Sequence, residues 1–137
     1  MAYWILKTEP EVYSWEMLEK DGRTRWEGVR NYQARNNLRL MKPGDIAFIY
    51  HSGEDKMILG IAKIISEAYP DPTATKGDWA VVDIEKVKPF QRVVSLDEMR
   101  NTHGLSVMPL VSQSRLSVSP ATDTQAEMIL KIAKTTL

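Results

Sequence analysis

The sequence predicts an α+β domain in which antiparallel strands curl into a small β-barrel flanked by short helices. Segments rich in β-forming residues occupy the centre of the chain, and segments with helical periodicity lie toward its flanks. Few strand–helix–strand units occur, which argues against a mainly parallel sheet. The chain has 137 residues and no internal repeat or linker. We therefore expect a single domain over residues 1–137.

Composition narrows the class of protein. Hydrophobic residues make up 43% of the chain and charged residues 26%, which are ordinary values for a globular domain. The chain has no cysteine, which excludes a disulfide framework, a thiolate zinc site and a cysteine nucleophile. It also has no basic leader followed by a long apolar run, and no apolar run near the roughly 20 residues that span a bilayer. We therefore expect a cytoplasmic protein that does not enter the membrane.

The first elements follow from alternation, caps and breakers. Residues 3–8 alternate and are rich in β-formers, which predicts a strand that ends at Pro10. Ser14 is a suitable N-cap for a short helix over residues 15–20. Residues 23–30 show no regular pattern, so we expect them to be irregular.

A second helix and a central hairpin come next. Asn31 is a suitable N-cap for a helix over residues 32–41, in which apolar residues recur at helical spacing. Residues 45–52 are apolar on both faces of a strand, which predicts a central position in the sheet. The returning strand over residues 57–65 contains Gly60, which indicates a bulge or a close backbone approach.

The rest of the chain begins with a polar connection over residues 67–78. Pro70 and Pro72 stiffen this connection, so it is a candidate rim for a pocket. The remaining expected elements are a strand over residues 79–87 that ends at Pro89, a helix begun by a capping box of Ser95 and Glu98, a closing strand over residues 115–120 and a helix over residues 122–133.

Residues 26–39 carry the strongest functional signal. They hold two aromatics, three arginines, three asparagines and a glutamine, groups that stack on a flat ring and hydrogen-bond its edge. Residues 20–42 contain seven basic and two acidic side chains, a local charge of seven minus two, or +5, although the whole chain has a formal net charge of zero. A basic patch on a neutral protein favours contact with a few phosphates near one recognised group. A solvated, arginine-rich helix face is the alternative.

Aromatic and amide residues supply the candidate contacts to a planar ligand. The aromatic candidates are Trp26, Tyr32 and Trp79, which either clamp a base or pack in the core. The polar candidates are Asn31, Arg35 and Asn36, which either read a base edge or anchor a phosphate. For Asn31, helix capping is the structural alternative.

A hydrolase is the alternative from a different class. It would use Ser52 as nucleophile, His51 as base and Asp71 as the group that orients the base. Neighbouring residues on a strand point to opposite faces, and the chain lacks a nucleophile elbow, so we favour binding over catalysis. Two histidines 52 positions apart and scattered carboxylates give no metal-ligand spacing, and no phosphate-binding glycine loop is present.

Six sequence blocks, in this order, resemble the EVE domain family. They are WILKTEP (4–10), YSW (13–15), WEGVRNYQARN (26–36), FIYHS (48–52), YPDPT (69–73) and QSRLSV (113–118). The resemblance implies a PUA-like β-barrel related to YTH and ASCH domains. It also implies recognition of a modified base, such as 5-methylcytosine, that is flipped into a pocket. Two departures are Glu27, where many members have aspartate, and a shorter connection between Pro72 and Trp79 than in eukaryotic members.

From the residues and this resemblance together, we predict a non-catalytic module that binds DNA or RNA containing a modified base. The residues expected to form the base pocket are Trp26, Val29, Asn31, Tyr32, Asn36, His51, Ser52 and Trp79. Those expected at phosphates or at the rim are Lys7, Arg30, Arg35, Tyr69, Asp71 and Arg115. We expect a monomer without cofactor or metal. The alternatives are a small hydrolase or nucleotide-processing enzyme that uses His51, and a metabolite-binding or protein-interaction module.

Overall fold

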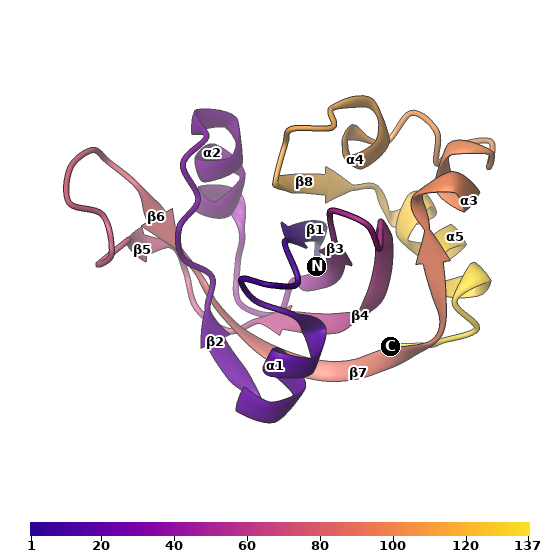
Figure 1. Ribbon diagram of the computed structural model, residues 1–137, viewed down its shortest axis with the longest axis horizontal. Helices are drawn as coiled ribbons and strands as arrows, with labels where there is room; N and C mark the ends of the chain where they lie inside the picture. Colours follow the sequence, from indigo (N-terminus) through magenta and orange to yellow (C-terminus); the bar gives the residue numbers. More distant parts are fainter.

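A curled six-stranded sheet forms the centre of the molecule (Figure 1). The computed structural model describes all residues from 1 to 137. From one edge to the other, the strands are β2 (Arg23–Arg25), β7 (Asp83–Ser95), β4 (Met57–Ile64), β3 (Ile46–His51), β1 (Tyr3–Thr8) and β8 (Val118–Ala121). A separate ribbon pairs β5 (Tyr69–Pro70) with β6 (Ala80–Val81). The predicted α+β class with a curled sheet and short helices is confirmed.

One pair of strands departs from the antiparallel prediction. β1 and β3 run parallel, with Tyr3 opposite Ile46 and Thr8 opposite His51, whereas the other pairs are antiparallel. Parallel neighbours need a long crossover connection. Residues 9–45 provide it, and they include α1 (Trp15–Asp21), β2 and α2 (Tyr32–Leu40).

The sheet separates two apolar cores. Alternate residues of β3 point to opposite faces, so Phe48 packs in one core and Ile49 in the other, as predicted for a central strand. The crossover, with α1 and α2, covers the face of Ile49. The face of Phe48 is covered by α3 (Leu96–Arg100), α4 (Pro109–Ser112) and α5 (Asp123–Ile132). None of these helices is long and apolar enough to cross a membrane.

Local caps fix where the helices begin. Ser14 accepts a hydrogen bond from the Met17 N–H at 3.1 Å and begins α1. Asn31 accepts one from the Ala34 N–H at 2.9 Å and begins α2. Ser95 begins α3 with the predicted capping box. Each cap satisfies N–H groups that lack a partner inside their own helix.

Three local predictions were wrong. Residues expected to be irregular contain β2, because Arg23 to Arg25 pair with the first residues of β7. β7 continues past Pro89 to Ser95, because the register with β4 shifts beside this proline and an irregular part of a ladder accommodates a residue without an N–H. The closing strand expected over residues 115–120 begins only at Val118 and ends at Ala121, as β8.

A buried carboxylate joins the starts of the two parallel strands. Asp45 precedes β3 and accepts hydrogen bonds of 3.0 Å from the Ala2 N–H, the Trp4 indole N–H and the Lys42 N–H. Burial alone would raise the pKa of Asp45, but these three donors and the charged N-terminus lower it. Asp45 therefore remains an anion that fixes how β1 lies beside β3.

Gly60 lies against the ring of Trp15, as the predicted close approach requires. A β-carbon added at Gly60 would be 2.4 Å from the nearest ring atom of Trp15, inside van der Waals contact. Trp15 is itself buried in the core on the side of α1. The β-bulge next to Gly60 is also present in the pairing of β3 with β4.

We predict that Gly60→Ala lowers the free energy of unfolding by about 1–3 kcal/mol, because the new methyl group overpacks the core against Trp15. Urea unfolding followed by circular dichroism measures this change. Lys63→Ala, at an exposed position of the same strand, serves as the control and should alter stability far less. Equal stability of Gly60→Ala and the wild type would contradict the packing described here.

Candidate functional site

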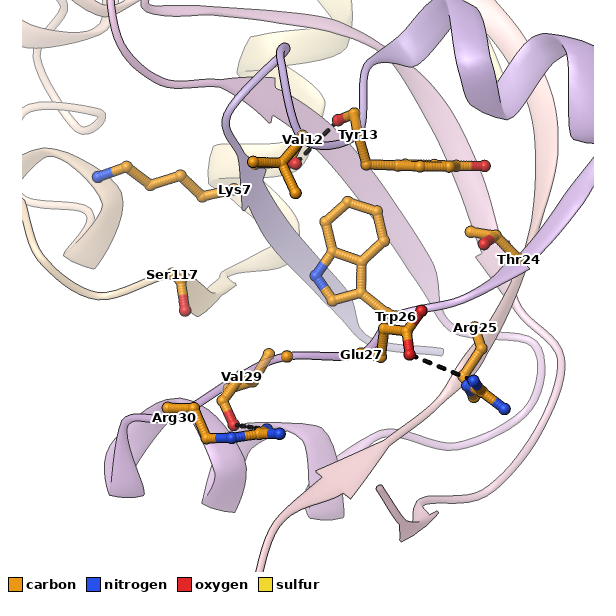
Figure 2. Close-up of a pocket in the computed structure, with 12 residues that line it drawn as sticks. Lys7, Val12, Tyr13, Thr24, Arg25, Trp26, Glu27, Val29, Arg30 and Ser117 are labelled. Atoms are coloured by element: carbon orange, nitrogen blue, oxygen red, sulfur yellow. Dashed lines mark hydrogen bonds and ion pairs between the residues drawn. The ribbon is translucent and has the colours of Figure 1, made fainter. Parts of the chain in front are cut away.

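A cavity of about 300 Å³ opens between the end of β1, the turn before α1 and the irregular segment before α2 (Figure 2). This volume lies at the lower end of the range for small-molecule sites. The lining residues are Lys7, Thr8, Val12, Tyr13, Thr24, Arg25, Trp26, Glu27, Gly28, Val29, Arg30 and Ser117.

Trp26 is the central side chain of the cavity wall. It is 7% exposed and packs edge-on against Tyr13, with ring centroids 6.1 Å apart and an interplanar angle of 89°. This contact and the core beneath fix the orientation of the indole. Figure 2 shows its nitrogen edge turned toward the side of the cavity where Lys7 and Ser117 lie. No hydrogen bond joins the indole N–H to the other residues that line the cavity, so this donor is available to a ligand (Figure 2).

The turn before α1 holds an apolar side chain at the cavity. The hydroxyl of Thr8 donates to the Tyr13 carbonyl at 2.8 Å, and the N–H groups of Val12 and Tyr13 donate to the Glu9 carbonyl at 2.9 and 3.0 Å. Val12 is 71% exposed and lies beside Trp26. An apolar surface therefore remains open to solvent next to the indole.

Lys7 closes the cavity on the side of residues 114–117. Its ammonium donates to the Ser114 carbonyl and lies 5.8 Å from the ring centroid of Tyr50, and its backbone N–H donates to the Ser117 carbonyl at 2.9 Å. Burial lowers the pKa of Lys7. Its side chain thus joins the end of β1 to the segment before β8.

Asp71 lies behind the part of the cavity wall formed by Gly28 and Arg30 and holds it in place. One carboxylate oxygen accepts from the Gly28 N–H and from Arg30, both at 3.0 Å. The other accepts from the N–H and the hydroxyl of Thr73, at 2.8 and 2.6 Å. Burial alone would raise the pKa of Asp71, but these donors, the Thr73 hydroxyl foremost, hold it far below its ordinary value. Gly28, whose φ is +84°, adopts a conformation that favours glycine.

Tyr32 and Trp79 stack on each other and do not line the cavity, which corrects the predicted clamp with Trp26. Their ring centroids lie 5.1 Å apart at an angle of 16°. Arg35 lies over this stack, 5.0 Å from the Tyr32 centroid, and donates to the Asp78 carbonyl at 3.1 Å. The pair fastens α2 to the loop before β6.

The structure places the predicted amide residues outside the cavity as well. Asn31 caps α2, and its side chain borders a neighbouring hollow. Asn36 accepts from Arg35 at 3.0 and 3.2 Å. Of the eight residues predicted for the base pocket, Trp26 and Val29 alone line the cavity.

His51 and Ser52 are also held away from the cavity. The Nε2 atom of His51 accepts from the Trp15 N–H at 2.9 Å, and its Nδ1 lies 3.2 Å from Asp55. Ser52 donates to the Thr8 carbonyl at 3.3 Å. The His51 side chain thus forms a hydrogen bond with neither Ser52 nor Asp71, so the triad of the hydrolase alternative is not assembled. No group of three or more potential metal ligands occurs in the structure.

Only some of the residues predicted at phosphates or at the rim line the cavity. Lys7 and Arg30 line the cavity, and Arg115 lies in the neighbouring hollow. Tyr69 donates to Asp83 at 2.5 Å and does not line the cavity, while Asp71 lies behind its wall. Sequence reasoning did not single out the lining residues Val12, Tyr13, Thr24, Arg25 and Ser117. For Tyr13 and Ser117, the signal was their place in the YSW and QSRLSV blocks.

We predict that Asp71→Asn lowers the free energy of unfolding at neutral pH by about 1–3 kcal/mol, because an amide cannot accept all four hydrogen bonds. A carboxylate whose folded pKa is lowered stabilises the fold above its ordinary pKa of 3.8 and loses this effect as pH falls toward the folded value. The stability difference between variant and wild type should therefore shrink below about pH 4. Urea titrations at pH 7 and pH 3 measure it.

Asp97→Asn serves as the control, since Asp97 is exposed and pairs with Arg100 on the surface at 3.1 Å. Its effect should stay within about 0.5 kcal/mol at both pH values. A stability difference for Asp71→Asn that does not depend on pH would contradict the role assigned to this carboxylate.

Comparisons with known proteins agree with this architecture. Residues 2–132 match the family model of the EVE domain. The chain is 38% identical to thymocyte nuclear protein 1 of Rattus norvegicus, covering 95% of this chain and 73% of that protein. It is 35% identical to the Homo sapiens protein of the same name, covering 96% of this chain and 73% of that protein.

Solved structures show the same fold. The crystal structure of protein Atu2648 from Agrobacterium tumefaciens has a TM-score of 0.95 at 40% identity, covering 98% of this chain and 94% of that one. The human THYN1 protein in complex with DNA containing 5-methylcytosine has a TM-score of 0.90 at 33% identity, covering both chains fully. A YTH domain from Zygosaccharomyces rouxii, 13% identical with a TM-score of 0.63, shares the fold, as expected for a PUA-like domain.

The family match covers nearly the whole chain, and the predicted resemblance is confirmed. This protein belongs to the EVE domain family.

Proposed function

We propose that this protein binds a modified nucleobase of DNA or RNA in the cavity beside Trp26 and catalyses no reaction on it. One observation carries the proposal: a cavity of about 300 Å³ next to a fixed indole whose N–H is free. The human relative that was solved with DNA containing 5-methylcytosine covers the whole of this chain and supports the same ligand class.

The walls of the cavity suit a planar ring with an apolar substituent. Trp26, Val12 and Val29 offer apolar surface, and the indole N–H offers a donor to a ring acceptor. Burying one added methyl group stabilises a complex by roughly 0.8 kcal/mol, which is about fourfold in affinity. We therefore expect a modest preference for the methylated base.

The charges around the cavity favour a few phosphate contacts over many. Arg25 pairs with Glu27 at 3.2 Å, Arg30 with Asp71 at 3.0 Å and Arg39 with Asp78 at 2.6 Å. The local charge of +5 over residues 20–42 already includes Glu27, and Asp71 and Asp78 from outside this range lower it by two, to +3. Sequence-independent attraction to nucleic acid should accordingly be weak.

The lining residues also favour binding over catalysis. No histidine lines the cavity, and Glu27 is its only carboxylate. Glu27 is held by Arg25, and the Thr8 hydroxyl donates to the Tyr13 carbonyl. The cavity thus holds no nucleophile paired with a general base, the arrangement that a hydrolase with a side-chain nucleophile requires.

We predict that the wild type binds an oligonucleotide with one 5-methylcytosine about fourfold more tightly than its unmodified counterpart. Trp26→Ala should abolish this difference, because it removes the wall and the donor together. Trp26→Phe keeps an aromatic ring in the core but removes the N–H and part of the indole surface, so it should weaken binding of both oligonucleotides. Fluorescence anisotropy measures the affinities, and circular dichroism checks that each variant is folded.

Trp79→Ala is the matched control. It also removes a tryptophan, but Trp79 stacks on Tyr32 and does not line the cavity. This variant should keep the preference for the modified base. The proposal fails if the wild type binds both oligonucleotides equally, or if Trp79→Ala loses the preference while Trp26→Ala retains it.

A further inference from the structure

A second hollow, of about 320 Å³, lies next to the cavity. It is lined by Asn31, Gln33, Ser112, Gln113, Ser114, Arg115 and Leu116. Figure 1 shows the two segments that supply these residues, the start of α2 and the stretch between α4 and β8, on the same side of the molecule.

The hollow and the cavity share a boundary. Arg30 lines the cavity and Asn31 the hollow, while Ser117 lines the cavity and Leu116 the hollow. Consecutive Cα atoms are about 3.8 Å apart. One strand of duplex DNA carries a phosphate for roughly every 3.4 Å of helix axis. The hollow therefore adjoins the cavity at two places along the chain, within reach of the strand that carries a base held beside Trp26.

The hollow offers donors and no negative charge. Arg115 is its only charged side chain, and no carboxylate lines it. The side-chain oxygen of Asn31 is engaged by the Ala34 N–H, which leaves its NH₂ group to donate. Such a lining favours an anion over a cation.

Arg115 differs from every other arginine of the chain. Of the eight arginines in the sequence, it alone makes neither an ion pair nor a hydrogen bond. The acidic partners of six others are Glu85 for Arg23, Glu27 for Arg25, Asp71 for Arg30, Asp78 for Arg39, Glu98 for Arg92 and Asp97 for Arg100. Arg35 donates to Asn36 and to the Asp78 carbonyl. A free guanidinium fork matches the geometry of a phosphate.

The segment that carries Arg115 is held in place. The Lys7 ammonium donates to the Ser114 carbonyl, and the Lys7 N–H donates to the Ser117 carbonyl at 2.9 Å. Leu116 is buried in the core between them. The backbone on both sides of Arg115 is thus fixed beside the cavity, and Lys7 acts here as a positioning residue.

We propose that this hollow binds the backbone phosphate next to the base held in the cavity, with Arg115 as its principal contact. The inference rests on the proposed function, because it takes the occupant of the cavity to be a base within a nucleic-acid chain. A phosphate contact positions the strand and carries no information about the base. Arg115 should therefore contribute equally to the binding of modified and unmodified strands.

We predict that Arg115→Gln weakens binding of both oligonucleotides by about tenfold, since it removes a charge-assisted contact. The ratio of the two affinities should stay unchanged. The plot of log affinity against log salt concentration should become shallower by about 0.7–0.9, the effect of one phosphate contact. Fluorescence anisotropy over a series of salt concentrations measures both quantities.

Lys131→Gln is the matched control, because it removes one exposed, unpaired positive charge on α5, which covers the other face of the sheet. It should leave affinity and salt dependence close to those of the wild type. If Arg115→Gln behaves like Lys131→Gln, or abolishes the preference for the modified base, the inference is overturned. If the wild type itself shows no preference, the proposed function fails instead, whatever the salt dependence of Arg115→Gln.

Discussion

The buried carboxylate of Asp71 is the interaction on which the site depends. It accepts four hydrogen bonds, two from the cavity wall and two from its own loop, so the wall and the loop cannot move separately. A buried anion that lost these donors would be strongly destabilising, which favours this single arrangement. The same loop presents Trp79 and Asp78 to the helix that follows the wall. One acidic side chain thereby holds the segment of Gly28 and Arg30 against the loop that the arginines of α2 contact.

Elements determined by neighbouring residues could be predicted from the sequence. Ser14, Asn31 and Ser95 mark helix starts because each cap bonds an N–H only three residues away. The parallel pairing of β1 with β3 could not be predicted, since it depends on a crossover of 37 residues, from 9 to 45. Pro89 was misread for a related reason: an irregular part of a ladder accommodates a proline, and the register shift beside Pro89 arises from its pairing with the distant strand β4.

The lining of the cavity was predicted only in part, for the same physical reason. Residues 26–36 were expected to act together, yet Asn31 begins a helix in the middle of them. Before the cap, Trp26 and Val29 line the cavity; after it, Tyr32 turns to Trp79, a partner 47 positions away. Other lining residues are Lys7 and Thr8 of β1 and Ser117 just before β8, and the pairing of these strands in the sheet brings them near Trp26. Composition identifies such a cluster, but long-range pairing decides which members face the ligand.

The ion pairs around the cavity matter because of how a base reader obtains specificity. Burial of one methyl group contributes only about fourfold in affinity, so discrimination is limited by background binding to unmodified strands. Each added phosphate contact strengthens modified and unmodified complexes alike and leaves their ratio unchanged. Pairing Arg25, Arg30 and Arg39 with carboxylates keeps this background low on a chain whose formal net charge is zero. In the proposed complex, one unpaired arginine beside the cavity positions the strand, while the cavity itself selects the base.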